Sequence, residues 1–299
     1  MKILLFGKAG QVGWELQRSL APLGDVVALD RAVSRELCGD LSNAAAIAET
    51  VRQVRPNVII NAAAYTAVDK AESEPTLAHA INAVAPGVLA REAAAIGAWL
   101  VHYSTDYVFD GSGDTARAED DPTGPLNEYG RSKLEGEQLV RSSGCRHLLF
   151  RTSWVYGVRG QNFPKTMLRL AAERDALAVI DDQYGAPTSA ELLADSTAHA
   201  IRTARRQPEC SGLYHLAASG ETTWYGYATY VIERARAAGR TIKVAADAVR
   251  PVPTSAYPTA ARRPANSRLD TGKFRQTFDL VLPDWKHGVD RLLDEIIEL

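Results

Sequence analysis

The segment Lys2-Ile3-Leu4-Leu5-Phe6-Gly7-Lys8-Ala9-Gly10-Gln11-Val12-Gly13 decides the fold of this 299-residue chain. A short apolar run leads into three glycines, and apolar residues then recur at helical spacing from Val12 to Leu20. A strand that turns through glycines into a helix lets the backbone approach a pyrophosphate, and the helix start offers free N–H donors. We therefore predict a dinucleotide-binding loop at Gly7, Gly10 and Gly13, although one extra residue separates the first two glycines relative to G-x-G-x-x-G.

Asp30 closes the second apolar run, Val26 to Leu29, and follows Gly13 by 17 residues. A carboxylate at the end of the second strand is placed to hold the ribose hydroxyls of a dinucleotide. The alternative is a tight turn followed by a surface aspartate. Asp30 should repel a 2′-phosphate, whereas the adjacent Arg31 would accept one, so NADH and NADPH both stay open.

Apolar runs and helical patterns alternate through the first half. Further strands are predicted at 58–60, 99–103 and 147–150, and helices at 44–54, 76–96 and 128–140. Strands that are almost continuously apolar indicate a parallel sheet covered on both faces. The later half alternates less regularly, with helices expected at 163–172, 192–202, 224–238 and 289–297. We predict an α/β, doubly wound (Rossmann-type) domain, mainly residues 1–153, interwoven with a smaller substrate-binding lobe, mainly residues 154–299.

Composition and charge exclude several classes of protein. The chain has 46% hydrophobic and 23% charged residues, which is ordinary globular composition. A formal net charge of -2 argues against a protein that coats nucleic acid. Cys38, Cys145 and Cys210 form neither a disulfide framework nor a zinc pattern. No apolar run approaches about 18 residues, and the start lacks a signal peptide pattern, so we expect a cytoplasmic protein without membrane or nucleic-acid partners.

Two further motifs carry side chains suited to proton transfer. Tyr129 and Lys133 are four residues apart on a predicted helix and share one face. A nearby ammonium favours tyrosinate and lowers the barrier to proton transfer from a phenol. Thr105 ends the strand that begins at Trp99, where strand ends face the ligand crevice of such sheets. A solvated helix face and a turn-capping threonine are the corresponding alternatives.

The order glycine loop, Ser/Thr strand end and Tyr-Lys helix resembles the extended short-chain dehydrogenase/reductases. Closer still, longer segments resemble the dTDP-4-dehydrorhamnose reductases, and the resemblance covers nearly the whole chain. These segments are Asn61 to Glu72, Ser104 to Phe109, Arg151 to Tyr156, Asp182 to Thr188 and Ala261 to Leu269. Tyrosine stands at position 65, where relatives can carry histidine.

The resemblance implies one set of residues for the cofactor and another for the sugar. The cofactor site would comprise Gly7, Gly10, Gln11, Val12, Gly13, Asp30, Asp40, Leu41, Ala64, Tyr65, Thr66, Tyr103, Tyr129 and Lys133. The sugar would contact Thr105, Asp106 and Trp154. Tyr129, Lys133 and Thr105 would be catalytic, and no protein ligand set for a metal is expected.

The implied reaction is reduction of dTDP-4-dehydro-6-deoxy-L-mannose to dTDP-L-rhamnose, used for cell-surface polysaccharide, by NADPH or NADH. A homodimer, in some relatives with a divalent ion such as Mg²⁺ at the interface, is also implied. Two rivals stay open, a sugar-nucleotide epimerase or dehydratase and a non-catalytic regulatory subunit. A dehydratase of the superfamily usually has Asp-Glu after the threonine, whereas here Asp106 precedes Tyr107. Arg262, Arg263 and Arg268 are candidates for the substrate diphosphate.

Overall fold

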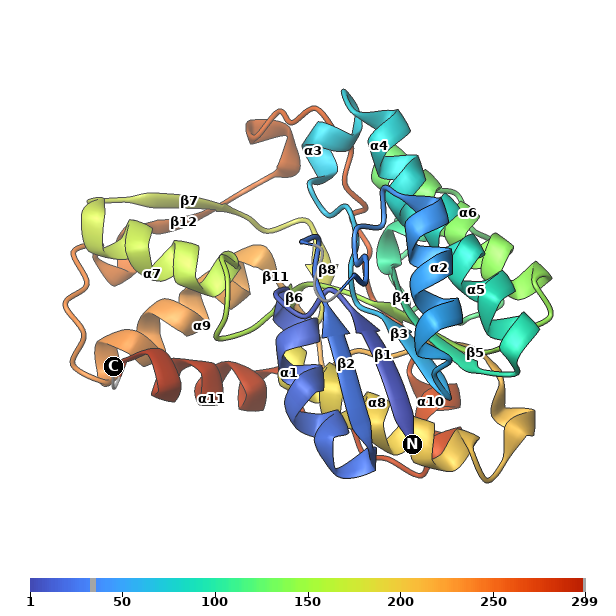
Figure 1. Cartoon of the computed structure of the whole chain (residues 1–299). Helices are drawn as coiled ribbons and strands as arrows, with labels where there is room; N and C mark the ends of the chain where they lie inside the picture. The colour runs from blue at the N-terminus through green and yellow to red at the C-terminus, as the bar shows by residue number, and fades with distance from the viewer. Residues whose placement is uncertain (33–35, 298–299) are drawn as a thin grey trace.

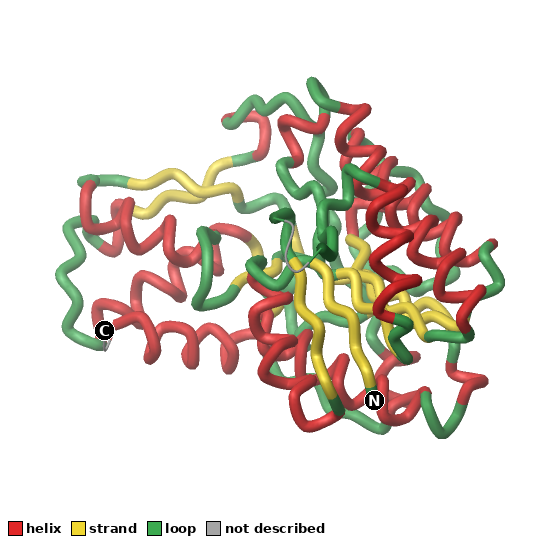
Figure 2. The backbone as a smooth tube through the Cα atoms, viewed as in Figure 1, coloured by secondary structure: helices red, strands yellow, loops and turns green. Residues whose placement is uncertain are grey.

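A six-stranded parallel sheet forms the centre of the molecule. The computed structural model describes residues 1–32 and 36–297. The strand order is β10-β5-β4-β3-β1-β2, and every neighbouring pair is parallel (Figures 1 and 2). The order reverses beside β1, which confirms the predicted doubly wound sheet. The strands are β1 (Lys2–Phe6), β2 (Asp25–Leu29), β3 (Val58–Asn61), β4 (Trp99–Thr105), β5 (Arg146–Thr152) and β10 (Gly212–His215).

Helices cover both faces of this sheet because alternate strand residues are apolar on each face. Ile3 and Leu5 pack with Leu16 and Leu20 of one helix layer, whereas Leu4 packs with the other layer. The first layer contains α1 (Gln11–Leu20), α8 (Ala190–Ala204) and α10 (Gly272–Phe278). The second contains α2 (Ala44–Val54), α5 (Ala85–Ile96) and α6 (Glu128–Ser142) (Figure 1).

A third apolar cluster forms a lobe beside the sheet, built from residues of the second half of the chain (Figure 1). It contains α7 (Phe163–Glu173), α9 (Trp224–Ala237), α11 (Trp285–Ile297), and β7 (Leu177–Ile180) paired with β12 (Val249–Val252). Two short pairs lie between lobe and sheet: β6 (Val155–Tyr156) with β9 (Thr188–Ser189), and β8 (Tyr184–Gly185) with β11 (Thr222–Thr223). Because α8, β10 and α10 return to the sheet layers, the division near residue 153 stays a prediction about folding units.

The single helix predicted for residues 76–96 was wrong in detail. The structure has α4 (Pro75–His79), a π-helical turn η2 (Ala80–Val84) and then α5. Proline at position 86 lacks an N–H and its ring would collide with the carbonyl four residues earlier, in Asn82. The π turn moves that carbonyl out of the regular ladder: the Ala85 N–H bonds to Ala80 O. Short elements with weak patterns, such as β10 and α10, were not predicted.

Turns and small helices complete the chain. They are η1 (Ala21–Leu23), α3 (Val68–Ala71), η3 (Asp106–Val108), η4 (Pro208–Cys210), η5 (Ala246–Ala248) and η6 (Thr254–Ala256). Of these, α3 and η3 stand at the carboxyl end of the sheet, because each begins a few residues after a sheet strand ends. None of the helices in the described ranges combines the length and apolar character needed to cross a bilayer.

Candidate active site

The carboxyl ends of the sheet strands open onto a cleft of about 900 Å³. Every residue predicted to bind cofactor or sugar lines this cleft except Gly13. Segments far apart in sequence, such as the glycine loop, Asp40-Leu41, Ala64 to Thr66 and Trp154, therefore meet at one place. The position agrees with the rule that ligands of open α/β sheets bind outside the carboxyl ends of the strands, where the strand order reverses.

The glycine loop is shaped by backbone contacts that no side chain would allow. Gly7 has φ +87°, and a Cβ there would lie 2.7 Å from the Ala63 nitrogen. A Cβ on Gly13 would lie 2.0 Å from the Gly7 oxygen, so Gly13 packs the helix on the loop rather than facing the cleft. Gly10 is the N-cap of α1 and offers no side-chain cap to the first turn. The first N–H donors of α1 are thus left for an anion.

Asp30 lies at the end of β2, beside two cationic side chains. Its Oδ1 accepts a hydrogen bond from the Ala32 N–H at 3.1 Å, and its Oδ2 lies 3.7 Å from Lys8 Nζ. Arg31 lines the same end of the cleft. Both partners of the Lys8–Asp30 pair are about one third exposed, so the pair is weak and can reorganise when a ligand binds.

Helix α6 is positioned by its cap and by a close approach at Gly130. Asn127 caps the helix through its Oδ1, which accepts from the Gly130 N–H at 2.8 Å. The Asn127 Nδ2 donates to Arg262 O at 2.7 Å, which ties the start of α6 to the C-terminal half. A Cβ on Gly130 would lie 2.3 Å from Tyr107 O, so only glycine lets α6 approach η3 this closely. These contacts bring Tyr129 and Lys133 to the cleft.

The ammonium group of Lys133 is buried beneath the cleft. It donates to the carbonyl oxygen of Tyr103, and its Nζ lies 3.3 Å from His102 Nε2. Burial lowers the pKa of Lys133 to about 8, and the carboxylate of Glu137 opposes the shift. Tyr103, predicted to meet the nicotinamide riboside, instead turns its phenol into the core, 2.6 Å from Thr197 Oγ1. With its phenol in this position, Tyr103 would contact the nicotinamide riboside through its backbone.

The Tyr129 phenol differs from the sequence-based expectation. We expected Lys133 to favour tyrosinate, but burial raises the pKa of Tyr129 to about 12, against a lowering effect of the Thr105 hydroxyl. The reason is that desolvation disfavours the phenolate more than nearby groups stabilise it. Tyr129 is therefore a protonated phenol at neutral pH, which is the form that can donate a proton.

Thr105 both caps the next turn and faces the cleft. Its Oγ1 accepts from the Tyr107 N–H at 3.1 Å and donates to Asp106 Oδ1 at 3.0 Å. The predicted cap is therefore present, and Thr105 also lines the cleft, while its contact with a substrate stays a prediction. Burial raises the pKa of Asp106 to about 6, against the lowering effects of the Ser267 and Thr105 hydroxyls. Asp106 lines the cleft, and its buried Oδ2 has no hydrogen-bond partner of good geometry in the described part of the chain.

Two stacked indoles also line the cleft. Trp154 and Trp224 have ring centroids 3.7 Å apart and planes 14° from parallel. Trp154 has φ +49°, and Gly185 leaves room for its ring, since a Cβ there would lie 2.7 Å from Trp154 Cε2. Sequence analysis did not assign Trp224 to the site. It lies 70 positions from Trp154, and only tertiary packing brings the two rings together.

Asn82 is a second residue that sequence analysis missed. It is buried in the π turn, and its amide pairs with both backbone groups of Tyr65, at 2.9 and 3.0 Å. Its Nδ2 also donates to Ser132 Oγ at 3.1 Å, and Ser132 donates to Tyr129 O at 2.8 Å. Asn82 thereby joins the predicted cofactor groove to helix α6. The signal in the sequence was Pro86, which forces the π turn.

Two of the three arginines considered for a diphosphate are engaged in ion pairs, whereas Arg262 is exposed and makes no ion pair with the described residues. Arg263 Nη2 lies 2.7 Å from Asp69 Oδ2, and Arg268 Nε lies 2.5 Å from Glu221 Oε2. The Arg263–Asp69 pair links the C-terminal segment to helix α3 beside the cleft. Neither arginine lines the cleft in this structure.

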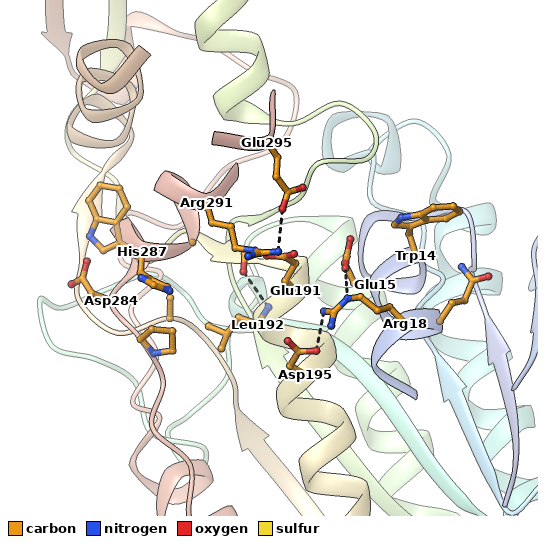
Figure 3. Close-up of a pocket in the computed structure, with 16 residues that line it drawn as sticks. Trp14, Glu15, Arg18, Glu191, Leu192, Asp195, Asp284, His287, Arg291 and Glu295 are labelled. Carbon is orange, nitrogen blue, oxygen red and sulfur yellow. Dashed lines mark hydrogen bonds and ion pairs between the residues drawn. The ribbon is translucent and has the colours of Figure 1, made fainter. Parts of the chain in front are cut away.

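A second groove, of about 920 Å³, lies between α1, α8 and α11 (Figure 3). Four of its five carboxylates are paired with arginines: Arg18 contacts Glu15 and Asp195, and Arg291 contacts Glu191 and Glu295. Throughout residues 1–32 and 36–297, no group of three or more His, Cys, Asp or Glu side chains is arranged to hold a metal ion.

Comparison with known proteins places this architecture in one family. The family model described as RmlD substrate binding domain matches residues 1–298. A dTDP-4-dehydrorhamnose reductase of Escherichia coli strain K12 is 61% identical over 296 residues, covering 99% of this chain and 98% of the relative. One from Burkholderia thailandensis is 47% identical over 301 residues, covering 99% of each chain.

Solved structures give the same assignment. A dTDP-4-dehydrorhamnose reductase of Clostridium acetobutylicum has a TM-score of 0.88 and 35% identity, covering 99% of each chain. The Bacillus anthracis enzyme, solved in complex with NADP, has a TM-score of 0.86 and 35% identity, covering 98% of this chain and 99% of that one. With these identities over nearly the full length, the chain belongs to the dTDP-4-dehydrorhamnose reductase family.

Proposed function

We propose that this chain reduces dTDP-4-dehydro-6-deoxy-L-mannose to dTDP-L-rhamnose with NADPH or NADH. The observation that carries the proposal is the meeting of a protonated phenol, a threonine hydroxyl and a buried lysine beside a glycine loop open to anions. Tyr129, Thr105 and Lys133 are the catalytic residues in this mechanism, and all three line the cleft. The substrate assignment is supported by relatives named for that reductase activity.

A nicotinamide dinucleotide fits the residues present. The Cβ-free cradle at Gly7 and the uncapped start of α1 suit a pyrophosphate held by Gly10, Gln11 and Val12. Asp30 would bind the adenosine ribose, and Lys8 and Arg31 stand where a 2′-phosphate would need cations. Asp40 and Leu41 would border the adenine, while Ala64, Tyr65 and Thr66 line the middle of the groove. When bound, the reduced cofactor supplies the hydride.

The side chains of the cleft then polarise the carbonyl, donate the proton and hold the two substrates. Thr105 donates a hydrogen bond to the carbonyl oxygen of the sugar, which polarises the carbonyl. Tyr129 gives its phenolic proton to the alkoxide that forms at that oxygen. Lys133 holds the nicotinamide-side ribose and supplies positive charge that stabilises the phenolate left behind. Asp106 Oδ2 accepts from a sugar hydroxyl, and Trp154 packs against the sugar ring.

The rival activities are less well supported by the site. Elimination of water requires an acid and a base beyond the Tyr-Lys pair, and Tyr107 stands where a second carboxylate would be expected. Tyr107 is a half-buried phenol in edge contact with the Tyr129 ring, at 5.6 Å between centroids. A phenol with an ordinary pKa of about 10 is a poor carboxylate substitute. A regulatory subunit would have no need for all three catalytic residues.

The homodimer and the interface ion stay predictions, since the only observation that bears on them is the groove of Figure 3 with its paired carboxylates. Light scattering of the purified chain with and without EDTA tests both: a monomer without EDTA would exclude the homodimer, and a dimer that EDTA leaves unchanged would exclude an ion needed at the interface.

The test of the proposed function is cofactor oxidation followed against a panel of keto-sugar nucleotides. Efficient turnover of dTDP-4-dehydro-6-deoxy-L-mannose is expected. Efficient turnover of only a different keto-sugar nucleotide would replace the substrate assignment, and turnover of none would remove the reductase assignment.

A further inference from the structure

His102 lies directly beneath Lys133 and has no role in the proposed mechanism. It belongs to β4, its side chain is 1% exposed, and its Nε2 lies 3.3 Å from Lys133 Nζ. A buried histidine beside a buried lysine is costly if both are charged. Burial, together with the charge of Lys133, lowers the pKa of His102 well below its ordinary value, against a raising effect of the Asn61 backbone, so the ring is neutral. A neutral imidazole carries one proton, and its position decides what the ring offers to Lys133.

The hydrogen bonds of Asn61 fix that position. The Ala63 N–H donates to Asn61 Oδ1 at 3.2 Å, so the amide oxygen of Asn61 is turned to the backbone. Its Nδ2 then faces His102 Nδ1 at 3.1 Å. An amide nitrogen only donates, so Nδ1 of His102 must be the acceptor and Nε2 must carry the proton. The N–H of His102 therefore points at Lys133 Nζ.

This arrangement discriminates between the two forms of Lys133. An uncharged amine has a lone pair that accepts from His102 Nε2–H, and it can still donate to Tyr103 O. An ammonium has no lone pair and would face the same N–H with a proton. We propose that His102, fixed by Asn61, is a positioning residue that favours the uncharged amine of Lys133 and so sets the pH range in which Lys133 is charged.

Other charged or titratable groups near Lys133 also affect whether its amine is charged. Glu137, one turn further along α6, favours the charged form, but Arg151 of β5 binds its carboxylate at 2.7 and 2.9 Å. Asp106 and Tyr107 of η3 line the same cleft as Lys133. Some charged side chains of the neighbouring helices make ion pairs elsewhere: His79 with Glu135, Arg52 with Glu92, and Asp69 with Arg263. His102 is thus the residue of β4 whose titratable side chain contacts Lys133 Nζ.

The direct test is the tautomer of His102, measured by long-range ¹H–¹⁵N NMR on the full chain with ¹⁵N-labelled histidine. The six histidines include an internal reference, because His147 Nδ1 faces the Cys145 carbonyl oxygen at 3.0 Å and must carry its proton there. We expect the proton on Nε2 in His102 and on Nδ1 in His147, with His102→Gln used to assign the signal. A proton on Nδ1 of His102, or on both nitrogens, would overturn the proposal. This measurement does not depend on the proposed function.

A kinetic test rests on the proposed function. Asn61→Asp places a carboxylate oxygen against His102 Nδ1, which moves the ring proton there and turns the Nε2 lone pair toward Lys133. The alkaline limb of the kcat/KM profile, expected near the Lys133 pKa of about 8, should then move upward by about one pH unit or more. Asn57→Asp, at the exposed residue before β3, is the matched control and should leave the limb unchanged. An unchanged limb in a folded Asn61→Asp protein would contradict the proposal. If that variant does not fold, the tautomer measurement still decides.

Discussion

The two walls of the cleft are built by different means. The cofactor wall, comprising residues 7–13, Asp30 and residues 64–66, is made of backbone: glycines without room for a Cβ and an uncapped helix start. The sugar wall, comprising Asp106, Trp154 and Trp224, is made of side chains, with a buried carboxyl and two stacked indoles. Tyr129 and Lys133 belong to α6 and line the same cleft.

The difference shows which part of a site can be inferred from sequence. Backbone geometry needs particular residues at fixed local spacing, so the cofactor wall leaves a motif. The sugar wall depends on contacts between distant segments, and its residue types are common in ordinary cores. Variants of the two walls should therefore affect different kinetic constants.

The largest effect is expected at Tyr129, which belongs to neither wall as defined above. Tyr129→Phe keeps the ring but loses the proton, so turnover should fall about a hundred- to ten-thousand-fold, while cofactor affinity stays largely intact. Thr105→Val should cost less, roughly tenfold, because it removes one hydrogen bond to the carbonyl oxygen. Single-turnover kinetics and cofactor fluorescence titration measure the two quantities. A Tyr129→Phe protein with near-normal turnover would refute the mechanism.

A smaller effect is expected at the sugar wall. Trp224→Ala removes the ring that stacks on Trp154 and should raise KM for the sugar nucleotide about tenfold, because large aromatics dominate such contacts. KM for NADPH should not change. Tyr257→Ala, an exposed aromatic of the second half of the chain, is the control. If Trp224→Ala changes the KM values of both substrates alike, the two walls are not separate.

The smallest effect is expected at Asp30. Asp30→Ala removes a ribose contact and a charge that repels a 2′-phosphate, and it frees Lys8, 3.7 Å away. The preference should shift toward NADPH by about three- to fivefold, a modest change because the pair is partly exposed. The ratio of kcat/KM for NADPH and NADH measures the shift. An unmoved ratio would mean that Asp30 does not contact the adenosine side.

Local patterns predicted much of the fold. The bounds of α2 were predicted correctly because Arg55-Pro56 stops its helical pattern, and five of the six sheet strands were recognised by their continuous apolar runs. The break at η2 was missed because the helical pattern continues through Pro86. Strand β10 is only four residues long and becomes a strand by pairing with β5, more than sixty positions earlier. Asn82 and Trp224 were missed for the same reason: their partners are distant in sequence.

The Tyr129–Lys133 pair shows a different limit. Sequence spacing placed both residues on one helix face, and both line the cleft. It did not show that Lys133 Nζ is turned to Tyr103 O and His102, or that burial dominates the pKa of Tyr129. The burial and orientation of Tyr129 and Lys133 depend on how α6 packs on the sheet. A pentapeptide motif does not contain that information.

The central claim is that this cleft performs one simple carbonyl reduction. An epimerase or dehydratase takes a hydride from the sugar and later returns it, so its cofactor ends unchanged. The deciding measurement mixes the protein with the keto-sugar nucleotide and excess NADPH, and compares moles of alcohol product with the fall in cofactor absorbance. We predict one cofactor oxidised per product molecule. Product without matching cofactor loss would contradict the reductase account, and no product from a folded, cofactor-binding sample would favour a regulatory subunit.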